Sequence, residues 1–142
     1  MKPAPWECPS CHRRFGRTNQ GHACQPGLSV EEYFSTGPPW ERPIFEAVRA
    51  HLESVGPIHI EPVQVGIFFK TSRTIIELRP KTKWVACSFS LERKLQSARI
   101  ARKVQEWHGR YYHVVNLRAP DEVDDELKAW LTECYELHSS SA

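Results

Sequence analysis

Residues 63–70 (VQVGIFFK), 75–79 (IIELR) and 84–91 (WVACSFSL) decide the fold. In each stretch, apolar residues alternate along the chain with a period of two, which is typical of β-strands that bury one face. Short polar segments separate the stretches, so consecutive strands are expected to pair antiparallel. The alternation and the short connections therefore predict an antiparallel meander in the middle of the chain.

The segment that follows this meander allows two interpretations. Ile100, Val104 and Trp107 fit one face of a helix. A turn at His108-Gly109-Arg110, followed by the run 111–117 (YYHVVNL), instead indicates a hairpin. We predict strands here.

Helical periodicity flanks the meander on both sides. Between Trp40 and Val55, apolar residues recur at steps of three and four until Gly56-Pro57 ends the pattern. After Pro120, a run of acidic residues suits the N-terminal end of a last helix. The expected apolar stripe of that helix is Val123, Leu127, Trp130, Leu131, Cys134 and Tyr135. A single capped helical turn is also predicted after Ser29, before Gly37-Pro38-Pro39 breaks it.

These elements predict an α+β fold in two layers, with the helices on one face of an antiparallel sheet. Composition and motif spacing divide the chain into three parts. Residues 1–27 form a small finger, residues 28–39 a linker with a short helix, and residues 40–142 the α+β domain.

The finger is predicted from Cys8-Pro9-Ser10-Cys11 and His22-Ala23-Cys24. Two thiolates spaced by two residues, closed by a His-x-Cys pair, supply four ligands for a tetrahedral zinc ion. The loop between the pairs has a single large apolar residue, Phe15, so metal binding would supply most of its folding free energy. We predict a structural Cys3His zinc site at Cys8, Cys11, His22 and Cys24.

Other uses of these residues are a disulfide, free thiols, or a redox or catalytic role. The chain has 5 cysteines, an odd number, and begins without an apolar signal segment, which disfavours a secreted disulfide framework. His12 is a rival ligand, but its position next to Cys11 would require a sharp reversal. Four protein ligands leave no open position for water, and the spacing does not distinguish zinc from iron.

Charge is segregated along the chain although the formal net charge is only +2. Residues 70–118 carry twelve basic and three acidic residues, whereas residues 119–142 carry one basic and seven acidic residues. The blocks could neutralise one another or leave a basic binding face. No apolar run approaches the ~20 residues that span a bilayer, so a cytoplasmic protein without membrane contact is expected.

The sheet face opposite the helices is expected to combine aromatic and basic side chains. Such a face can stack unpaired bases and contact phosphates, with little sequence preference. An acidic peptide, a second subunit or a further hydrophobic layer could also cover it. We predict a non-catalytic module that binds nucleic acid, single-stranded or without sequence specificity, and a protein-interaction or assembly module is the alternative. The predicted contacts are Arg13, Arg14 and Arg17 of the finger and Lys70, Arg79, Trp84, Lys103, Trp107, Tyr112 and Arg118 of the domain.

A hidden enzyme is the third interpretation. Cys87 and His113 are the one candidate pair of nucleophile and base, since both lie in predicted strands and could be neighbours in the sheet. The alternation places each of them with apolar neighbours. The favoured interpretation is a buried thiol and a core histidine.

The order of the segments resembles the bacterial family called domain of unknown function 5655. The resemblance covers nearly the whole chain. It rests on the two cysteine motifs, on Phe15-x-Arg17-x-Asn19-Gln20, and on a later run through Leu91, Tyr112-His113-Val114, Ala119-Pro120, Trp130 and Tyr135. It implies a zinc-type finger attached to a small α+β domain and supplies no activity. Only the four metal ligands carry over.

Overall fold

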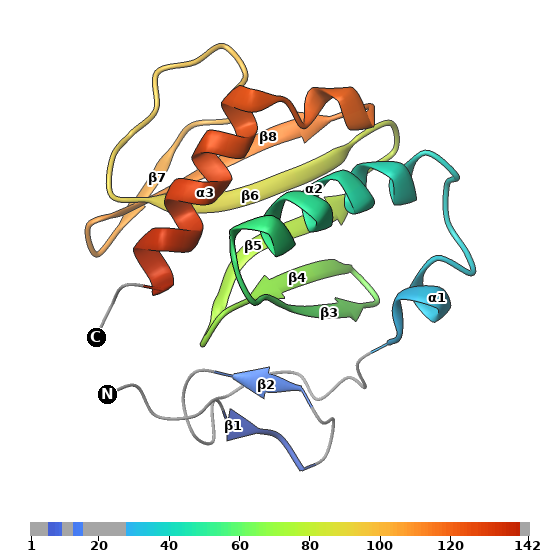
Figure 1. Ribbon diagram of the computed structural model, residues 1–142. Helices are drawn as coiled ribbons and strands as arrows, with labels where there is room; N and C mark the ends of the chain where they lie inside the picture. Colours follow the sequence, from blue (N-terminus) through green and yellow to red (C-terminus); the bar gives the residue numbers. More distant parts are fainter. Residues whose placement is uncertain (1–5, 10–12, 16–27, 140–142) are drawn as a thin grey trace.

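The computed structural model describes residues 6–9, 13–15 and 28–139 of the chain (Figure 1). Its centre is a sheet of six strands in the order β3-β4-β5-β6-β8-β7, and every neighbouring pair is antiparallel. The strands are β3 (His59–Val63), β4 (Gly66–Lys70), β5 (Thr74–Pro80), β6 (Val85–Leu91), β7 (Gln105–Trp107) and β8 (Arg110–Leu117).

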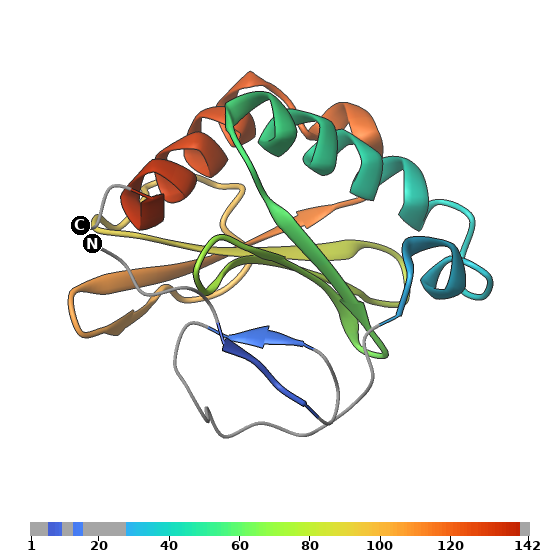
Figure 2. The same cartoon turned by 60° about the horizontal axis from the view of Figure 1, so that its bottom comes forward.

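Helices α2 (Glu41–Val55) and α3 (Asp125–Ser139) lie side by side on one face of this sheet. Figure 2 shows this helical layer above the sheet and the N-terminal hairpin of β1 (Trp6–Glu7) and β2 (Arg14–Phe15) below it. The short helix α1 (Val30–Tyr33) and the 3-10 helix η1 (Pro120–Glu122) flank the layers. The predicted two-layer α+β architecture is confirmed. We call the sheet face opposite α2 and α3 the open face.

The first predicted strand, residues 63–70, is divided in the structure. Val63 ends β3 and pairs with Gly66 at the start of β4, so Gln64 and Val65 form the turn. A Cβ atom at Gly66 would lie 2.2 Å from the carbonyl oxygen of Leu78, which explains the glycine. The sequence of β3, HIEPV, contains a proline and a glutamate and so gives only a weak strand pattern.

The predicted hairpin after residue 100 is present as β7 and β8. Its turn places His108 at φ 52° and Gly109 at φ 78°, the left-handed pair typical of a two-residue hairpin turn. Ile100 forms an isolated bridge with Val115, so this upstream segment also lies beside β8. The helical interpretation of Ile100, Val104 and Trp107 is wrong because the backbone of this segment pairs with β8.

The hydrophobic core fills the space between the sheet and the helices. Phe45 and Leu52 of α2, Leu127 and Leu131 of α3, and Phe89 of β6 are all at most 1% exposed. Burial of such side chains contributes roughly 1.5–3 kcal/mol each to stability. The predicted apolar stripes of both long helices are confirmed as the faces that contact the sheet.

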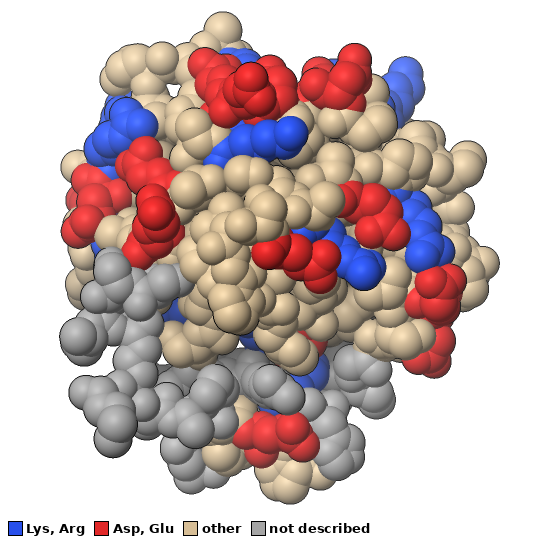
Figure 3. All heavy atoms as spheres, in the orientation of Figure 1, with Lys and Arg blue, Asp and Glu red and all other residues tan. Residues whose placement is uncertain are grey.

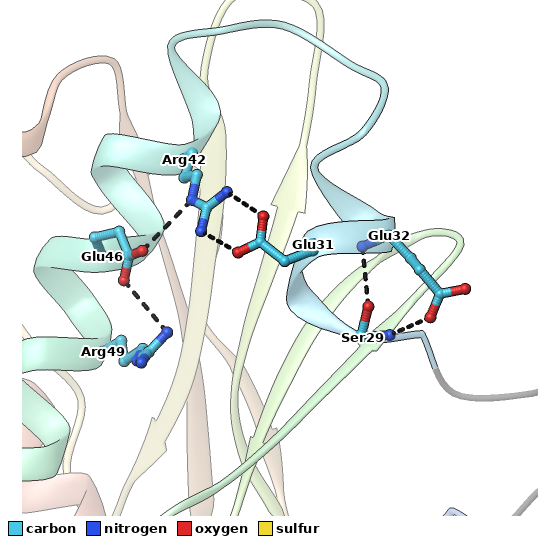
Figure 4. A network of polar contacts seen from close by, with 6 residues as sticks. All are labelled: Ser29, Glu31, Glu32, Arg42, Glu46 and Arg49. Carbon is cyan, nitrogen blue, oxygen red and sulfur yellow. Dashed lines mark hydrogen bonds and ion pairs between the residues drawn. The ribbon is translucent and has the colours of Figure 1, made fainter.

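The segment before α2 is attached to the domain by backbone and side-chain contacts (Figure 4). Ser29 and Glu32 form a reciprocal capping box around the start of α1. Arg42 of α2 binds both carboxylate oxygens of Glu31, at 3.1 and 2.7 Å. The Leu28 N–H also donates to the Pro62 carbonyl of β3, at 2.9 Å. The chain that leaves the N-terminal hairpin is thus held against the edge of the sheet.

Candidate functional site

The N-terminal hairpin begins the predicted finger. Trp6 pairs with Phe15 and Glu7 with Arg14, and the Cys8 N–H donates to the Arg13 carbonyl at 2.9 Å. Cys8 is 4% exposed at the start of the loop that these contacts close. Cys8 is the one predicted metal ligand among the described residues. Cys11, His22 and Cys24 lie outside them, as does the predicted contact Arg17.

Glu61 of β3 connects this hairpin to the sheet. Arg13 Nε donates to Glu61 Oε1 at 2.6 Å, and Lys70 Nζ donates to the same oxygen at 3.1 Å. His59 Nε2 lies 3.2 Å from the other oxygen, Oε2. The Arg13 guanidinium also lies 5.6 Å from the centroid of the Phe68 ring on β4. We call Arg13, His59, Glu61 and Lys70 the Glu61 cluster.

The Glu61 cluster changes the role of two predicted nucleic-acid contacts. Arg13 is 9% exposed and Lys70 only 2% exposed. Both cations neutralise Glu61 inside the protein, because a buried carboxylate is stable only when cations and hydrogen bonds compensate its charge. The expectation that these two side chains project to a ligand is therefore corrected. The hairpin docks on the open face over β3 and β4 (Figure 2).

The open face continues across β6 and β8 with a different set of side chains. Alternation along β8 places Arg110, Tyr112, Val114 and Asn116 on this face, and Arg118 continues the row just beyond the strand. Trp84 immediately precedes β6 and lies beside this end, where the Arg118 guanidinium is 5.2 Å from its ring centroid. Tyr112 is 45% exposed and Trp107 of β7 is 64% exposed.

A cavity of about 340 Å³ opens beside Trp84; we call it the Trp84 cavity. Within the described part of the chain, neither Lys81, Arg102 nor Arg118 forms an ion pair with an acidic side chain. Neither Lys81 nor Arg102 was predicted as a contact. For Arg102 the reason is that the sequence does not show that residues 100–101 return beside β8. The residues that line the cavity are Lys81, Trp84, Ala86, Ala101, Arg102 and Asn116.

The remaining predicted contacts that the structure describes are Arg79, Lys103 and Arg14. Arg79 of β5 is exposed and pairs with Glu77 at 3.4 Å. Lys103 is exposed in the segment before β7. Arg14 is placed by its backbone in β2. The structure thus brings Trp84, Tyr112 and Arg118 onto one face with Arg79, and separates them from Arg13 and Lys70.

Charges on the helical side are arranged differently. Figure 3 shows acidic and basic side chains next to one another over α2 and α3. Arg93 binds Glu133 at 2.9 Å, and Arg99 binds Asp124 at 2.7 Å. The hydrogen bond from the Leu127 N–H, together with the Arg99 guanidinium, holds the pKa of Asp124 below its usual value. The acidic end of the chain therefore neutralises part of the basic middle, as the alternative of internal balance predicted.

Cys87 and His113 do not form a catalytic pair in the described structure. Cys87 is fully buried against the helices, and burial raises the pKa of its thiol to about 12. His113 Nε2 accepts a hydrogen bond from the Leu95 N–H at 3.0 Å, and burial lowers the pKa of its imidazole. The His113 ring stacks on Phe89, with 5.5 Å between centroids. A protonated thiol and an engaged imidazole support the interpretation as core residues.

Among residues 6–9, 13–15 and 28–139, no cluster of three or more His, Cys, Asp or Glu side chains could hold a metal ion. Three of the four predicted ligands lie outside these residues. In the same residues, no helix has the length and apolar character needed to cross a membrane.

The fold and the open face define a small α+β protein whose sheet is covered by helices on one side and, over β3 and β4, by an N-terminal hairpin on the other. The chain belongs to the family described as Domain of unknown function (DUF5655), whose model matches residues 30–138. The matched region begins after the cysteine motifs. No curated protein and no solved structure matches the chain significantly.

Proposed function

We propose that the protein binds single-stranded nucleic acid, without catalysis, on the open face across β6 and β8. The observation that carries this proposal is the group of cations around the Trp84 cavity. Lys81, Arg102 and Arg118 have no acidic partner among the described residues, whereas the arginines over α2 and α3 are paired. Unpaired cations beside an aromatic cavity favour a polyanion that also carries flat rings.

The spacing of the side chains on β8 suits an extended strand. Arg110 and Arg118 are eight residues apart, which corresponds to roughly 26 Å along a β-strand. Between them lies Tyr112, whose exposed ring can stack on a base, and Asn116, whose amide can donate and accept hydrogen bonds. Guanidinium groups at the two ends would contact phosphates. Such contacts give affinity that falls with salt and has little sequence preference.

We further propose that Cys8, Cys11, His22 and Cys24 hold a structural zinc ion. The described part of the finger supports this, because β1 and β2 pair antiparallel and the Cys8 N–H donates to the Arg13 carbonyl, so the Cys-x-x-Cys motif falls within the connection between two paired strands. Thiolate pairs on such loops are typical zinc ligands. A zinc ion bound there would fix the loop that precedes Arg13.

Titration of fluorescent single-stranded DNA and RNA, followed by anisotropy, tests the nucleic-acid proposal. We expect the double variant Lys81→Ala/Arg102→Ala to bind more weakly than the native protein. Lys128→Ala removes one positive charge from α3 on the other side of the sheet, and it is the control for each of the single variants Lys81→Ala and Arg102→Ala. Equal losses in Lys128→Ala and in the single variants would mean that net charge alone drives binding. No binding at low salt would contradict the proposal and favour a protein partner.

Metal content tests the zinc proposal separately. Cys11→Ser should lower the zinc bound per chain, measured by elemental analysis, and leave the far-ultraviolet circular dichroism of the α+β domain nearly unchanged. Cys134→Ala is the control, because Cys134 is buried between α3 and β5 and donates to the Ile75 carbonyl. Equal zinc content in Cys11→Ser and native protein would contradict the assigned ligands.

A further inference from the structure

A second cavity, of about 240 Å³, lies on β5, β6 and β8 at the opposite end of the sheet from the Trp84 cavity. Arg73 reaches it from the turn between β4 and β5, and Arg110 from the first position of β8. Its hydroxyl groups come from Thr74, Ser88, Ser90 and Tyr112. We call this the Tyr112 cavity. None of the contacts predicted from sequence except Tyr112 lines it.

Its polar groups are unusually free to bind a ligand. Ser90 is only 5% exposed, and its hydroxyl forms no hydrogen bond among the described residues. The hydroxyls of the half-buried Ser88 and of Tyr112, which is 45% exposed, also form none among these residues. Hydroxyl groups that face a cavity and form no hydrogen bond within the protein are available to donate to a polar ligand.

The charge of the lining determines which ligand fits. Arg73 has no acidic partner among the described residues, and Arg110 uses one nitrogen, Nη1, for Glu92 at 3.3 Å. Glu77, the one carboxylate in the lining, pairs with Arg79 at 3.4 Å. Arginine donates hydrogen bonds and never accepts them. Two guanidinium groups and several hydroxyls therefore require an anion with several acceptor oxygens.

We propose that the Tyr112 cavity binds a phosphate monoester. Its terminal oxygens provide three strong acceptors and about two negative charges, which match two guanidinium groups and the neighbouring hydroxyls. The volume is slightly below the ~300 Å³ typical of the smallest ligand pockets, so it suits the phosphate and a small part of the attached group. The phosphate could belong to a free small molecule or to the phosphorylated end of a nucleic-acid strand.

Nuclear magnetic resonance titrations of the full chain with inorganic phosphate, adenosine monophosphate and adenosine test this site. We expect phosphate and the monophosphate to shift the amide signals of Ser88, Ser90 and Tyr112, and adenosine to leave them unchanged. Arg73→Ala should weaken phosphate binding about tenfold or more, because it removes a charge-assisted contact. Tyr112→Phe, which removes only a hydroxyl, should weaken it less.

One control variant separates this site from other effects. Arg93→Ala removes an arginine that binds Glu133 outside the cavity, and it should not change phosphate binding. Absence of any shift at millimolar phosphate would overturn the proposal, as would binding that Arg73→Ala leaves unchanged. This result is independent of oligonucleotide binding, since the probe is phosphate alone.

A comparison of oligonucleotides identifies the source of the phosphate. Tighter binding of a 5′-phosphorylated single strand than of the same strand with a 5′-hydroxyl, abolished by Arg73→Ala, would assign the cavity to strand ends. Equal binding of the two strands, together with saturable binding of the monophosphate, would assign it to a small molecule. Both results support a phosphate monoester site.

Discussion

Two regions of the open face carry basic side chains, and they use them in different ways. Over β3 and β4, Arg13 and Lys70 both donate to Glu61 and are almost completely buried. Beside β6 and β8, Lys81, Arg102 and Arg118 are exposed and have no acidic partner among the described residues. The first region holds the N-terminal hairpin on the sheet, and the second is open to a ligand. Lysine and arginine residues in a sequence therefore indicate a binding surface only where no acidic side chain of the protein neutralises them.

The largest effect is expected from Glu61→Ala. Loss of the carboxylate leaves Arg13 and Lys70 without their shared acceptor, which costs about 3–5 kcal/mol when a buried ion pair is broken. Denaturant unfolding followed by tryptophan fluorescence measures this loss. A change below ~1 kcal/mol would mean that the Glu61 cluster behaves as a solvent-exposed pair, and the distinction between the two regions would fail.

Arg13→Ala should have the next largest effect. Glu61 keeps Lys70 as a partner, so we expect a loss of about 1–3 kcal/mol, the cost of removing one donor from a buried acceptor. Amide hydrogen exchange should also become faster at Cys8, whose N–H bonds to the Arg13 carbonyl. Unchanged exchange at Cys8 and unchanged stability would show that Arg13 does not anchor the hairpin.

The double variant Lys81→Ala/Arg102→Ala tests the second region, beside β6 and β8. Because neither cation has an acidic partner in the part of the chain that the structure describes, removal of both should change the free energy of unfolding by less than ~0.5 kcal/mol. Binding to a single-stranded oligonucleotide should weaken about tenfold at low salt. A large loss of stability with unchanged binding would reverse the roles assigned to the two regions.

The smallest effect is expected from Arg42→Ala. Arg42 binds Glu31 at the surface, where the Glu31 side chain is 78% exposed, and exposed pairs contribute little to stability. The unfolding midpoint should stay within experimental error of the native value, and oligonucleotide binding should not change. A clear destabilisation would show that the contact shown in Figure 4 fixes α1 more strongly than exposure suggests.

Periodicity predicted most of the fold. The strands around Ile76 and Phe89 and both long helices follow from apolar spacing alone, because one buried face imposes its period on the sequence. The strand His59–Val63 was missed because its sequence contains a proline and a glutamate, which are unusual in a strand. The glutamate, Glu61, is neutralised by Arg13, which lies far away in the chain. The pattern of residues within one strand does not show that a distant residue will neutralise its charge.

The candidate site was predictable only in part. Strand alternation predicts that Trp84, Tyr112 and Arg118 share one face, and the structure places them there; their role as contacts stays a prediction. Arg13 and Lys70 were misplaced, since their partner Glu61 lies 48 and 9 residues away in the chain. Arg102 and the hydroxyls of the Tyr112 cavity were missed for a similar reason. These side chains come together only when segments from different parts of the chain pack against one another.

The central claim is that Lys81, Arg102 and Arg118, which lie beside β6 and β8 and have no acidic partner among the described residues, bind a single-stranded polyanion. The salt dependence of that binding tests the claim most directly. For a single strand, the slope of log K against log salt is about −0.7 per phosphate contact. We predict a steep slope for the native protein that becomes shallower by about 1.4 in Lys81→Ala/Arg102→Ala, the equivalent of two lost contacts. An identical slope in both proteins, or no binding at low salt, would contradict the claim.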